Sequence, residues 1–313
     1  MIYPKPLQIG DHIAIICPST PTSREKVDLA ETAFKELGLM PIMYPSCYAY
    51  HGHLAGNDAL RLKDLHEAFA STHIKGIVCL KGGSGATRLL PKIDFEMIKK
   101  NPKVFIGYSD ITALLTTIQQ NCDFMTFHGP MATSEIFIDP LHQDDLYSRD
   151  SFWSNLTTAG GYHGQLYNPK NEELISLYDG TCEGLLTGGN LSLLAGTLGS
   201  PYEVDTKGKV IFIEEIGEEL YKVDKMLTSL AHAGKFKDCV GLIFGTFTNC
   251  NQEDKPAYAG KDLDLLTIIE EVVIPFQKPI LFNLRAGHNF PQPTLPIGGR
   301  IYMNTYEKKL ILL

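Results

Sequence analysis

Short apolar segments alternate with amphipathic helical segments through the first 120 residues. Strand-like runs occupy residues 12–18, 40–45, 74–80 and 103–107. Helical spacing of apolar residues predicts helices over 23–38, 57–71 and 111–120, and the second has its apolar positions at Leu60, Leu62, Leu65 and Ala68. Because parallel strands need crossover connections, this alternation predicts an α/β fold with a doubly wound parallel sheet.

The pattern changes after about residue 140, where polar and aromatic residues replace the periodic segments. Further strands are predicted over 209–215, 239–247 and 279–284, with a hairpin over 300–313. Residues 184–201 indicate a turn followed by a short buried helix, and 218–234 an amphipathic helix. We therefore expect an N-terminal domain over 1–155, a linker over 156–179 and a smaller, strand-rich mixed α/β domain over 180–313.

Composition excludes several classes of partner. The 313 residues carry a net charge of −8 and no block of lysine or arginine, which argues against a nucleic acid or an anionic membrane. No apolar run is long enough to span a bilayer, and residues 1–20 lack the features of a signal peptide, so we expect a cytoplasmic protein. Seven scattered cysteines without a CxxC pair favour reduced, buried thiols over disulfides or zinc.

One serine stands where a predicted strand turns directly into a helix. The stretch VFIGYSDITALL ends its strand at Gly107, and its helix would direct Ile111 towards the sheet. Ser109 would then lie at the carboxyl edge of a parallel strand, where open α/β sheets place their sites. Two interpretations remain open here: a nucleophile elbow, whose second glycine is replaced by Ile111, or a serine that caps the helix.

A glycine-rich loop, CLKGGSGATRLL, follows the preceding predicted strand. It has neither the ending of a P-loop nor a GxGxxG fingerprint, so nucleotide binding is weakly supported. Loops after neighbouring parallel strands meet at one edge of the sheet. The N–H groups of Gly83 and Asp110 would therefore form an oxyanion hole beside Ser109; a tight turn that requires glycine is the compatible alternative.

A nucleophilic serine needs a histidine as base and an acid to orient it. His288 lies in a Gly/Pro-rich loop after a predicted strand, whereas His128 is better explained as a buried structural residue. Glu214 and Glu215 end another predicted strand. Adjacent strand residues face opposite sides, so one of the two can face a site, and a solvated acidic pair is the alternative.

In this order, the segments GGSGATRLLPKID, FIGYSDITALL, FHGPM, GGNLSLLAGTLGSP, IFIEEIGEELYKVDKMLTSL and RAGHNFPQPTLPIG resemble the L,D-carboxypeptidase family of serine peptidases, peptidase family S66. The resemblance implies an N-terminal domain similar to class I glutamine amidotransferases and a Ser-Glu-His triad divided between two domains. It assigns the triad to Ser109, Glu214 and His288, and the oxyanion donors to Gly83 and Asp110. Ser84 replaces a frequent aromatic residue, and Glu215 replaces a frequent aspartate, which leaves open which acid orients the histidine.

The resemblance also implies an activity. We expect release of terminal D-alanine from tetrapeptide muropeptides in peptidoglycan recycling, without metal or cofactor, by a cytoplasmic homodimer. A cationic group should bind the substrate's terminal carboxylate, and the substrate-binding candidates are Arg88, Asn190 and Arg285. The alternatives are hydrolysis of peptidyl- or aminoacyl-nucleotide conjugates, as in microcin C self-immunity proteins, and a non-catalytic ligand-binding protein on the same fold. EEIGEELYKVDKML favours the carboxypeptidase branch.

Overall fold

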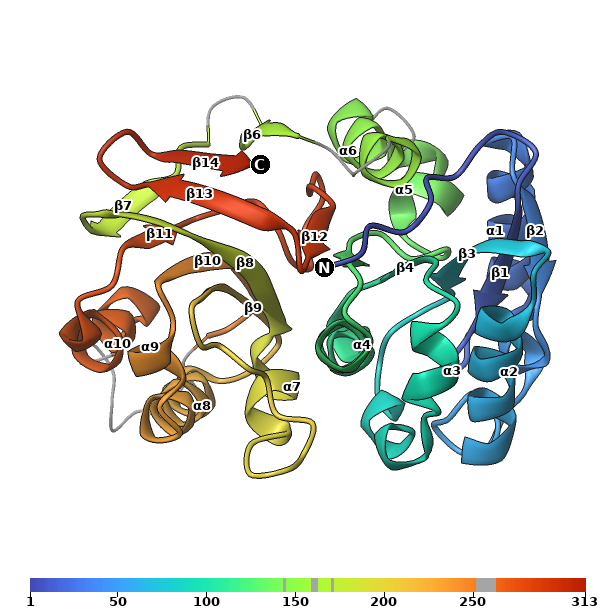
Figure 1. The fold of residues 1–313 in the computed structure, drawn as a ribbon, viewed down its shortest axis with the longest axis horizontal. Coiled ribbons are helices and arrows are strands. Elements are labelled where there is room, and N and C mark those ends of the chain that lie inside the picture. The colour runs from blue at the N-terminus through green and yellow to red at the C-terminus, as the bar shows by residue number, and fades with distance from the viewer. Residues whose placement is uncertain (143–144, 159–162, 170–171, 252–262) are drawn as a thin grey trace. The chain divides into compact units, whose positions relative to one another are not determined.

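The protein folds into two compact units (Figure 1). The computed structural model describes residues 1–142, 145–158, 163–169, 172–251 and 263–313. Unit 1 contains Met1–His163 and Phe290–Gly298, and unit 2 contains Gly164–Asn289 and Gly299–Leu313. Among the described residues, no helix is both long enough and apolar enough to cross a membrane.

Unit 1 is built on a six-stranded sheet in the order β12-β5-β4-β3-β1-β2. The strands are β1 (His12–Ile16), β2 (Met40–Met43), β3 (Ile74–Cys79), β4 (Val104–Gly107), β5 (Thr126–His128) and β12 (Leu295–Ile297). All neighbours pair in parallel except β12, which is antiparallel to β5. The chain reverses its winding between β1 and β3, the kind of place where doubly wound sheets bind ligands.

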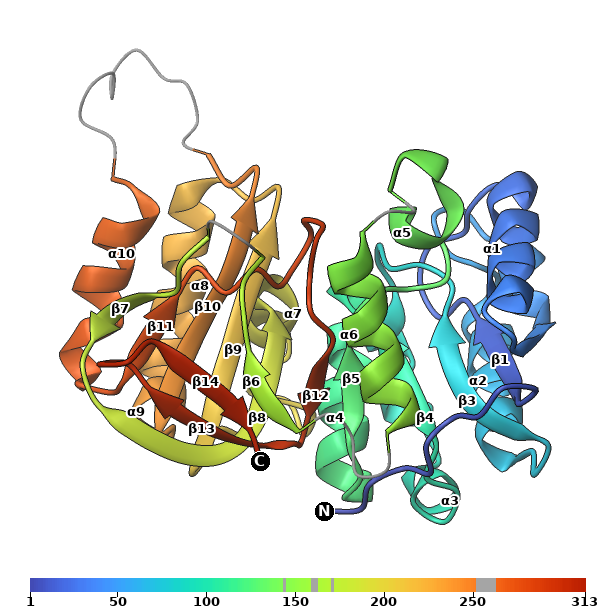
Figure 2. The same ribbon diagram turned by 90° about the horizontal axis from the view of Figure 1, so that it is seen from above.

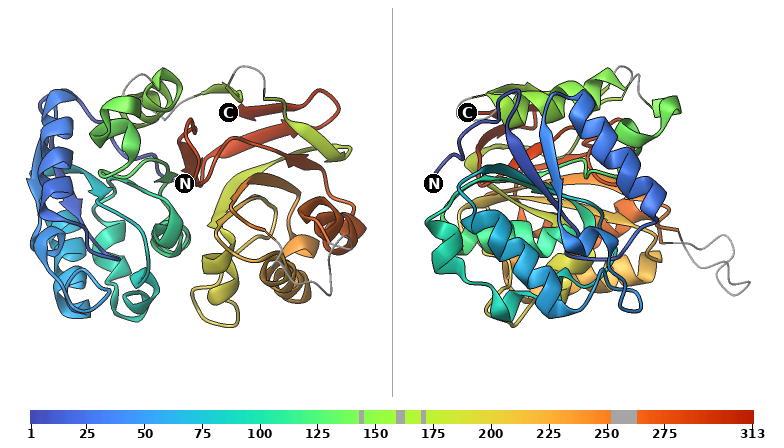
Figure 3. Two further views of the ribbon diagram at one scale, coloured as in Figure 1. Left: turned by 180° about the vertical axis from the view of Figure 1, so that it is seen from behind. Right: turned by 90° about the vertical axis from the view of Figure 1, so that its right-hand side faces the viewer.

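Helices cover both faces of this sheet (Figure 3), which confirms the predicted doubly wound fold. One face packs against three of them: α1 (Arg24–Glu36), α5 (Glu135–Ile138) and α6 (Leu146–Thr157). The other helices are α2 (Asp58–Ala70), α3 (Phe95–Lys99) and α4 (Thr112–Cys122), and short 3-10 turns lie at 45–48, 86–88, 90–92, 109–111 and 140–142. Helix α2 differs from the expectation, because Arg61 and Asp64 are buried on it with Leu65, whereas Leu60 and Leu62 are half-exposed.

Unit 2 is smaller and contains an eight-stranded mixed sheet in the order β6-β14-β13-β8-β9-β10-β11-β7. Its strands are β6 (Gly164–Leu166), β7 (Ile175–Tyr178), β8 (Thr181–Asn190), β9 (Lys209–Ile216), β10 (Gly241–Thr248), β11 (Ile280–Phe282), β13 (Arg300–Asn304) and β14 (Lys309–Leu312). Its helices are α7 (Leu191–Gly196), α8 (Leu220–His232), α9 (Lys235–Asp238) and α10 (Leu265–Val272), followed by a 3-10 turn at 274–276; they lie on one side of the sheet (Figure 2).

Several local predictions for unit 2 are confirmed. Helix α8 buries Leu220, Val223, Leu227 and Leu230. The terminal hairpin forms, with β13 antiparallel to β14. The turn expected within 184–190 is wrong, because these residues continue strand β8. A Cβ on Gly188 would lie 2.0 Å from the carbonyl oxygen of Phe212, so the glycine lets β8 and β9 approach closely rather than making a turn.

The domain boundaries also differ from the expected ones. The expected linker 156–179 contains strands β6 and β7 of the second sheet, and its residues 159–162 and 170–171 lie outside the described residues. Residues 290–298, expected in the C-terminal domain, belong to unit 1, because β12 pairs with β5. All seven cysteines are free thiols and five are buried. Burial raises the pKa of the Cys17 thiol to about 12.

Candidate active site

Ser109 lies in a sharp corner between β4 and α4. Its φ angle is +62°, in the left-handed region that is unfavourable for residues other than glycine. The Ser109 side chain caps neither the 3-10 turn at 109–111 nor α4, so the capping interpretation is wrong. A Cβ on Gly107 would lie 2.8 Å from Ile111 Cγ2. The glycine before the serine thus makes room for Ile111, which stands where an elbow motif has its second glycine.

The two glycines after Lys81 have different spatial roles. A Cβ on Gly82 would lie 2.9 Å from Ser109 Cβ and 3.2 Å from its Oγ, so Gly82 leaves space for the serine. Gly83 has φ +121°, and a Cβ there would lie 2.2 Å from Thr20 Oγ1. Thr20 Oγ1 accepts a hydrogen bond from Ser84 N at 3.0 Å. Within the described residues, Gly83 N–H donates no hydrogen bond, which leaves it available to a ligand.

The carboxylate of Asp110 joins the loops around Ser109. It is 4% exposed, and its Oδ2 accepts hydrogen bonds from Ser19 Oγ at 2.5 Å and from Ala86 N at 2.8 Å. Ser19 follows β1, and Ala86 ends the glycine-rich loop after β3. Asp110 therefore fixes both loops relative to the corner that contains Ser109. Sequence reasoning considered only its backbone N–H and missed this contact.

Arg61 forms a second connection between the same loops and was not found from the sequence. Its guanidinium is buried on α2 and donates from Nη1 to the carbonyl oxygens of Pro18 and Gly85. Its Nη2 donates to Asp58 Oδ1 at 2.6 Å. An arginine is rarely fully buried unless it is paired, so its position in a helix gave no signal of this role.

In unit 2, the geometry brings Glu214 and His288 together. Glu214 lies in the buried part of β9 and has no exposed side-chain surface, whereas the side chain of His288 is 11% exposed. Glu214 Oε2 lies 2.7 Å from His288 Nδ1. A carboxylate only accepts hydrogen bonds, so this contact places a proton on Nδ1, and in the neutral ring Nε2 is then the basic nitrogen.

Gly287 is required for this pair to form. It has φ +140°, and a Cβ there would lie 2.4 Å from Thr246 Oγ1 and 2.9 Å from Glu214 Oε2. The loop before it is fixed to β10, because Thr246 N donates to the carbonyl oxygen of Ala286 at 2.9 Å. The Gly-His pair noted in the sequence therefore has a steric cause.

Glu215 faces away from His288 and contacts the start of α7. Its Oε2 accepts hydrogen bonds from Ser192 N at 2.8 Å and Ser192 Oγ at 2.6 Å, and its Oε1 accepts from Asn190 Nδ2 at 2.9 Å. The acid that contacts the histidine is thus Glu214. Asn190 is 3% exposed, and its Oδ1 accepts from Leu193 N at 3.4 Å, so this substrate-binding candidate caps a helix.

The two arginine candidates for substrate binding also have partners. Arg88, on the surface of unit 1, makes hydrogen bonds of 3.0–3.2 Å to both carboxylate oxygens of Asp58. These bonds hold the pKa of Asp58 below its usual value. Arg285, in unit 2, lies 3.3 Å from Glu172 and donates from its backbone N to Asn168 Oδ1 at 2.8 Å.

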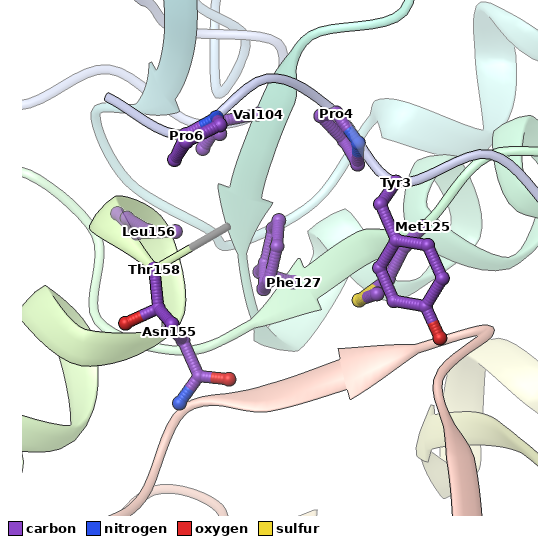
Figure 4. Close-up of a pocket in the computed structure, with 9 residues that line it drawn as sticks. All are labelled: Tyr3, Pro4, Pro6, Val104, Met125, Phe127, Asn155, Leu156 and Thr158. Atoms are coloured by element: carbon purple, nitrogen blue, oxygen red, sulfur yellow. The ribbon is translucent and has the colours of Figure 1, made fainter. Parts of the chain in front are cut away.

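Other features of unit 1 do not contribute to this site. The crevice in Figure 4 is lined mainly by apolar side chains, among them Tyr3, Val104 and Met125. Val104 begins β4, so the crevice lies at the amino end of that strand, and Ser109 follows its carboxyl end. His128 is fully buried on β5 with its ring centroid 6.0 Å from that of Tyr108. Among the described residues, no cluster of His, Cys, Asp or Glu could hold a metal ion.

Similarity to known proteins extends over nearly the whole chain. A model of the LD-carboxypeptidase N-terminal domain matches residues 13–129, and one of the C-terminal domain matches residues 183–303. A probable murein peptide carboxypeptidase of Bacillus subtilis is 40% identical over 309 residues, which cover 99% of this chain and 93% of the relative.

Solved structures agree as well. The muramoyltetrapeptide carboxypeptidase from Oxalobacter formigenes has a TM-score of 0.82 at 28% identity, covering 96% of this chain and 97% of that one. An MccF-like protein from Bacillus anthracis has a TM-score of 0.83 at 30% identity, covering 100% and 99%. These matches place the chain among carboxypeptidase hydrolases. It belongs to the LD-carboxypeptidase family, peptidase S66.

Proposed function

We propose that this protein is a serine-type L,D-carboxypeptidase that releases terminal D-alanine from tetrapeptide muropeptides. Family membership and relatives named murein peptide and tetrapeptide carboxypeptidases support the reaction class. The observation that carries the serine mechanism is the 2.7 Å contact between buried Glu214 and His288 Nδ1, because it prepares an imidazole to act as a base. The left-handed corner at Ser109 supplies the matching nucleophile.

In the proposed mechanism, Ser109 Oγ attacks the carbonyl carbon of the bond to D-alanine while His288 Nε2 takes the serine proton. Glu214 stabilises the imidazolium that results. The N–H groups of Gly83 and Asp110 donate to the oxyanion, and His288 then gives its proton to the leaving amine. Water, deprotonated by His288, releases the acyl group from Ser109. This mechanism requires Ser109 of unit 1 and His288 of unit 2 to meet on the substrate.

The proposal includes a cytoplasmic location, a role in peptidoglycan recycling and a homodimer, all three implied by the family resemblance. Light scattering coupled to size-exclusion chromatography measures the oligomeric state. A mass equal to one chain at assay concentration would contradict the dimer and leave the proposed reaction untouched.

The central experiment follows a tetrapeptide muropeptide by mass spectrometry. Wild-type protein should remove one D-alanine, with or without EDTA, and Ser109→Ala and His288→Ala should remove none. A phosphonate or acyl probe should label Ser109 in the wild-type protein. D-alanine release that survives Ser109→Ala, or that stops with EDTA, contradicts a serine mechanism.

Hydrolysis of peptidyl- or aminoacyl-nucleotide conjugates is the second candidate. The likeness to the MccF-like protein at 30% identity favours keeping it in the test. Both substrate classes should be assayed in parallel on one preparation. Cleavage of the conjugate without release of D-alanine from the muropeptide would select this candidate. If neither substrate is cleaved and Ser109 is not labelled, the non-catalytic interpretation gains support.

A further inference from the structure

A carboxypeptidase distinguishes a chain end from an internal bond by its free carboxylate, and a cationic side chain is the usual receptor for that group. None of the three candidates chosen from the sequence is well placed for this role. Arg88 is paired with Asp58, Arg285 with Glu172, and Asn190 is buried against Glu215. A receptor that is still without an anionic partner should therefore be sought near Ser109.

Lys81 has the required properties. It is half-buried in the segment that follows β3, and within the described residues it makes no ion pair or side-chain hydrogen bond. Of the other half-buried lysines, Lys209 and Lys222 are paired with acids, whereas Lys278 of unit 2, like Lys81, makes no ion pair or side-chain hydrogen bond within the described residues. A half-buried lysine can keep its ammonium in water while its stem packs on the protein, so an ammonium without an acidic partner is available to an anionic ligand.

The position of Lys81 relative to the proposed reaction centre follows from its neighbours. It directly precedes Gly82, whose Cα is so close to Ser109 that a Cβ would lie 2.9 Å from the serine Cβ. It is two residues from Gly83, a proposed oxyanion donor. Burial raises the pKa of Cys17, and the positive charge of Lys81 opposes that rise, so the ammonium is near enough to the end of β1 to act on the thiol.

The segment at the end of β1 is part of the same ligand-facing edge. Cys17 Sγ donates to the carbonyl oxygen of Thr20, and Thr20 packs against Gly83. The terminal carboxylate of the substrate is one residue beyond the scissile carbonyl, a distance of roughly 4 Å along the chain. A lysine side chain reaches about 6 Å from its Cα, so Lys81 can bridge this span while the carbonyl is at Ser109.

We propose that the Lys81 ammonium binds the C-terminal carboxylate of the substrate. This inference rests on the proposed carboxypeptidase function and deepens it, because it names the group that restricts cleavage to the last residue. The ligand class is a peptide with a free α-carboxylate on its terminal D-amino acid. The same peptide with a terminal carboxamide has no negative charge to bind and should lose this contact.

The test pairs changes in the protein with a change in the substrate. The substrates are a tetrapeptide with a free D-alanine carboxylate and the same peptide ending in D-alaninamide. The proteins are wild type, Lys81→Met, Lys81→Arg and the control Lys92→Met, which removes an exposed positive charge from the same unit. Mass spectrometry gives kcat and KM for each combination, and thermal unfolding checks that each variant folds.

Wild-type protein and Lys92→Met should prefer the free acid by about 10- to 100-fold in kcat/KM, the range for a hydrogen bond to a charged group. Lys81→Met should lose this preference through a higher KM for the acid, with the amide unaffected. Lys81→Arg should keep most of it, because arginine also binds carboxylates.

Two results overturn the assignment of Lys81 while the proposed function stands: an active Lys81→Met that retains the preference, or one slowed equally on both substrates. Equal slowing on both substrates would mean that Lys81 stabilises the oxyanion or supports the fold and does not bind the terminal carboxylate. If wild-type protein releases no D-alanine from the acid and Ser109 is not labelled, the proposed function itself fails, and this assignment fails with it.

Discussion

Replacing Gly287 by alanine tests how the histidine and its acid are held. The new Cβ would lie 2.9 Å from Glu214 Oε2, whereas ordinary contacts begin at 3.4 Å, so the carboxylate or the loop must move by about 0.5 Å. A shift of that size directly away from the ring stretches the 2.7 Å contact to His288 to about 3.2 Å, the outer limit of a hydrogen bond. We expect kcat to fall by about 10- to 100-fold, because small misplacements of catalytic groups have large effects on rate.

The same substitution should destabilise the fold. The φ angle of +140° is strained for alanine by about 1–3 kcal/mol, and the overlap with Thr246 Oγ1 at 2.4 Å adds about 1–3 kcal/mol. Gly208→Ala is the matched control in unit 2, because Gly208 also has a positive φ, of +68°, but nothing lies within 4 Å of its Cβ position. The control should lose about 1–2 kcal/mol of stability and keep its kcat.

The assay combines thermal unfolding with D-alanine release well below the unfolding temperature. The double variant Thr246→Ala/Gly287→Ala removes the overlap with Thr246 Oγ1 and keeps the one with Glu214 Oε2. It should therefore regain stability but not kcat. Retention of kcat within about threefold of wild type in Gly287→Ala would refute the steric argument. Full recovery of kcat in the double variant would show that Thr246, and not Glu214, transmits the effect.

Four further outcomes follow from described contacts. Ser109→Gly should be more stable than Ser109→Ala in urea unfolding by about 0.5–1 kcal/mol, because glycine relieves the left-handed φ of +62° at some cost in chain entropy; the reverse order would contradict strain at the corner. Glu214→Gln should lower kcat by about 10³–10⁴-fold through the wrong histidine tautomer, whereas Glu215→Gln should mainly lower the unfolding temperature; equal kcat values would refute the division of roles. Asp110→Ala should lower the free energy of unfolding by about 2–4 kcal/mol, because Ser19 Oγ and Ala86 N lose their acceptor. A loss of less than about 1 kcal/mol by calorimetry would show that the Asp110 carboxylate does not hold the two loops. Burial raises the pKa of Cys17 to about 12, so the thiol ionises at lower pH in the unfolded chain than in the folded protein. This contribution to stability is intact below about pH 8.5 and is lost as the pH rises towards 12. Cys17→Ala should reduce the fall of unfolding free energy with pH by about 1.4 kcal/mol per pH unit, and an unchanged pH dependence would contradict the raised pKa.

The parts of the fold that the sequence predicted are those with strong local periodicity. The parallel strands of unit 1 and helix α8 have continuous or regularly spaced apolar residues, so local pattern and burial agree. Strand β8 was missed because Gly188 looks like a turn residue, although its role is a close approach to Phe212. Strand β12 was missed because its pairing with β5 spans more than 160 residues and its sequence is rich in proline.

In the candidate site, too, the residues with a local sequence signal could be predicted and the others could not. Ser109 could be located because a strand-to-helix corner leaves a local signal, and the structure gives that corner a positive φ. The choice between Glu214 and Glu215 could not be made, since it depends on which face of β9 meets the loop that contains His288. The contacts of Asp110 and Arg61 depend on three loops that meet only in the folded chain, and no local pattern signals them.

The return of residues 290–298 to unit 1 has a consequence for biosynthesis. Domains generally fold in the order in which the ribosome delivers them. Unit 1 cannot finish folding before unit 2 is synthesised, because β12 completes its sheet only after Gly164–Asn289 have been made. At ordinary translation rates this delay is on the order of ten seconds, during which the β5 edge has no strand beside it. The nascent N-terminal half is then a natural client for chaperones, and a chain truncated before residue 290 should be prone to aggregate even though every residue of the serine corner is present.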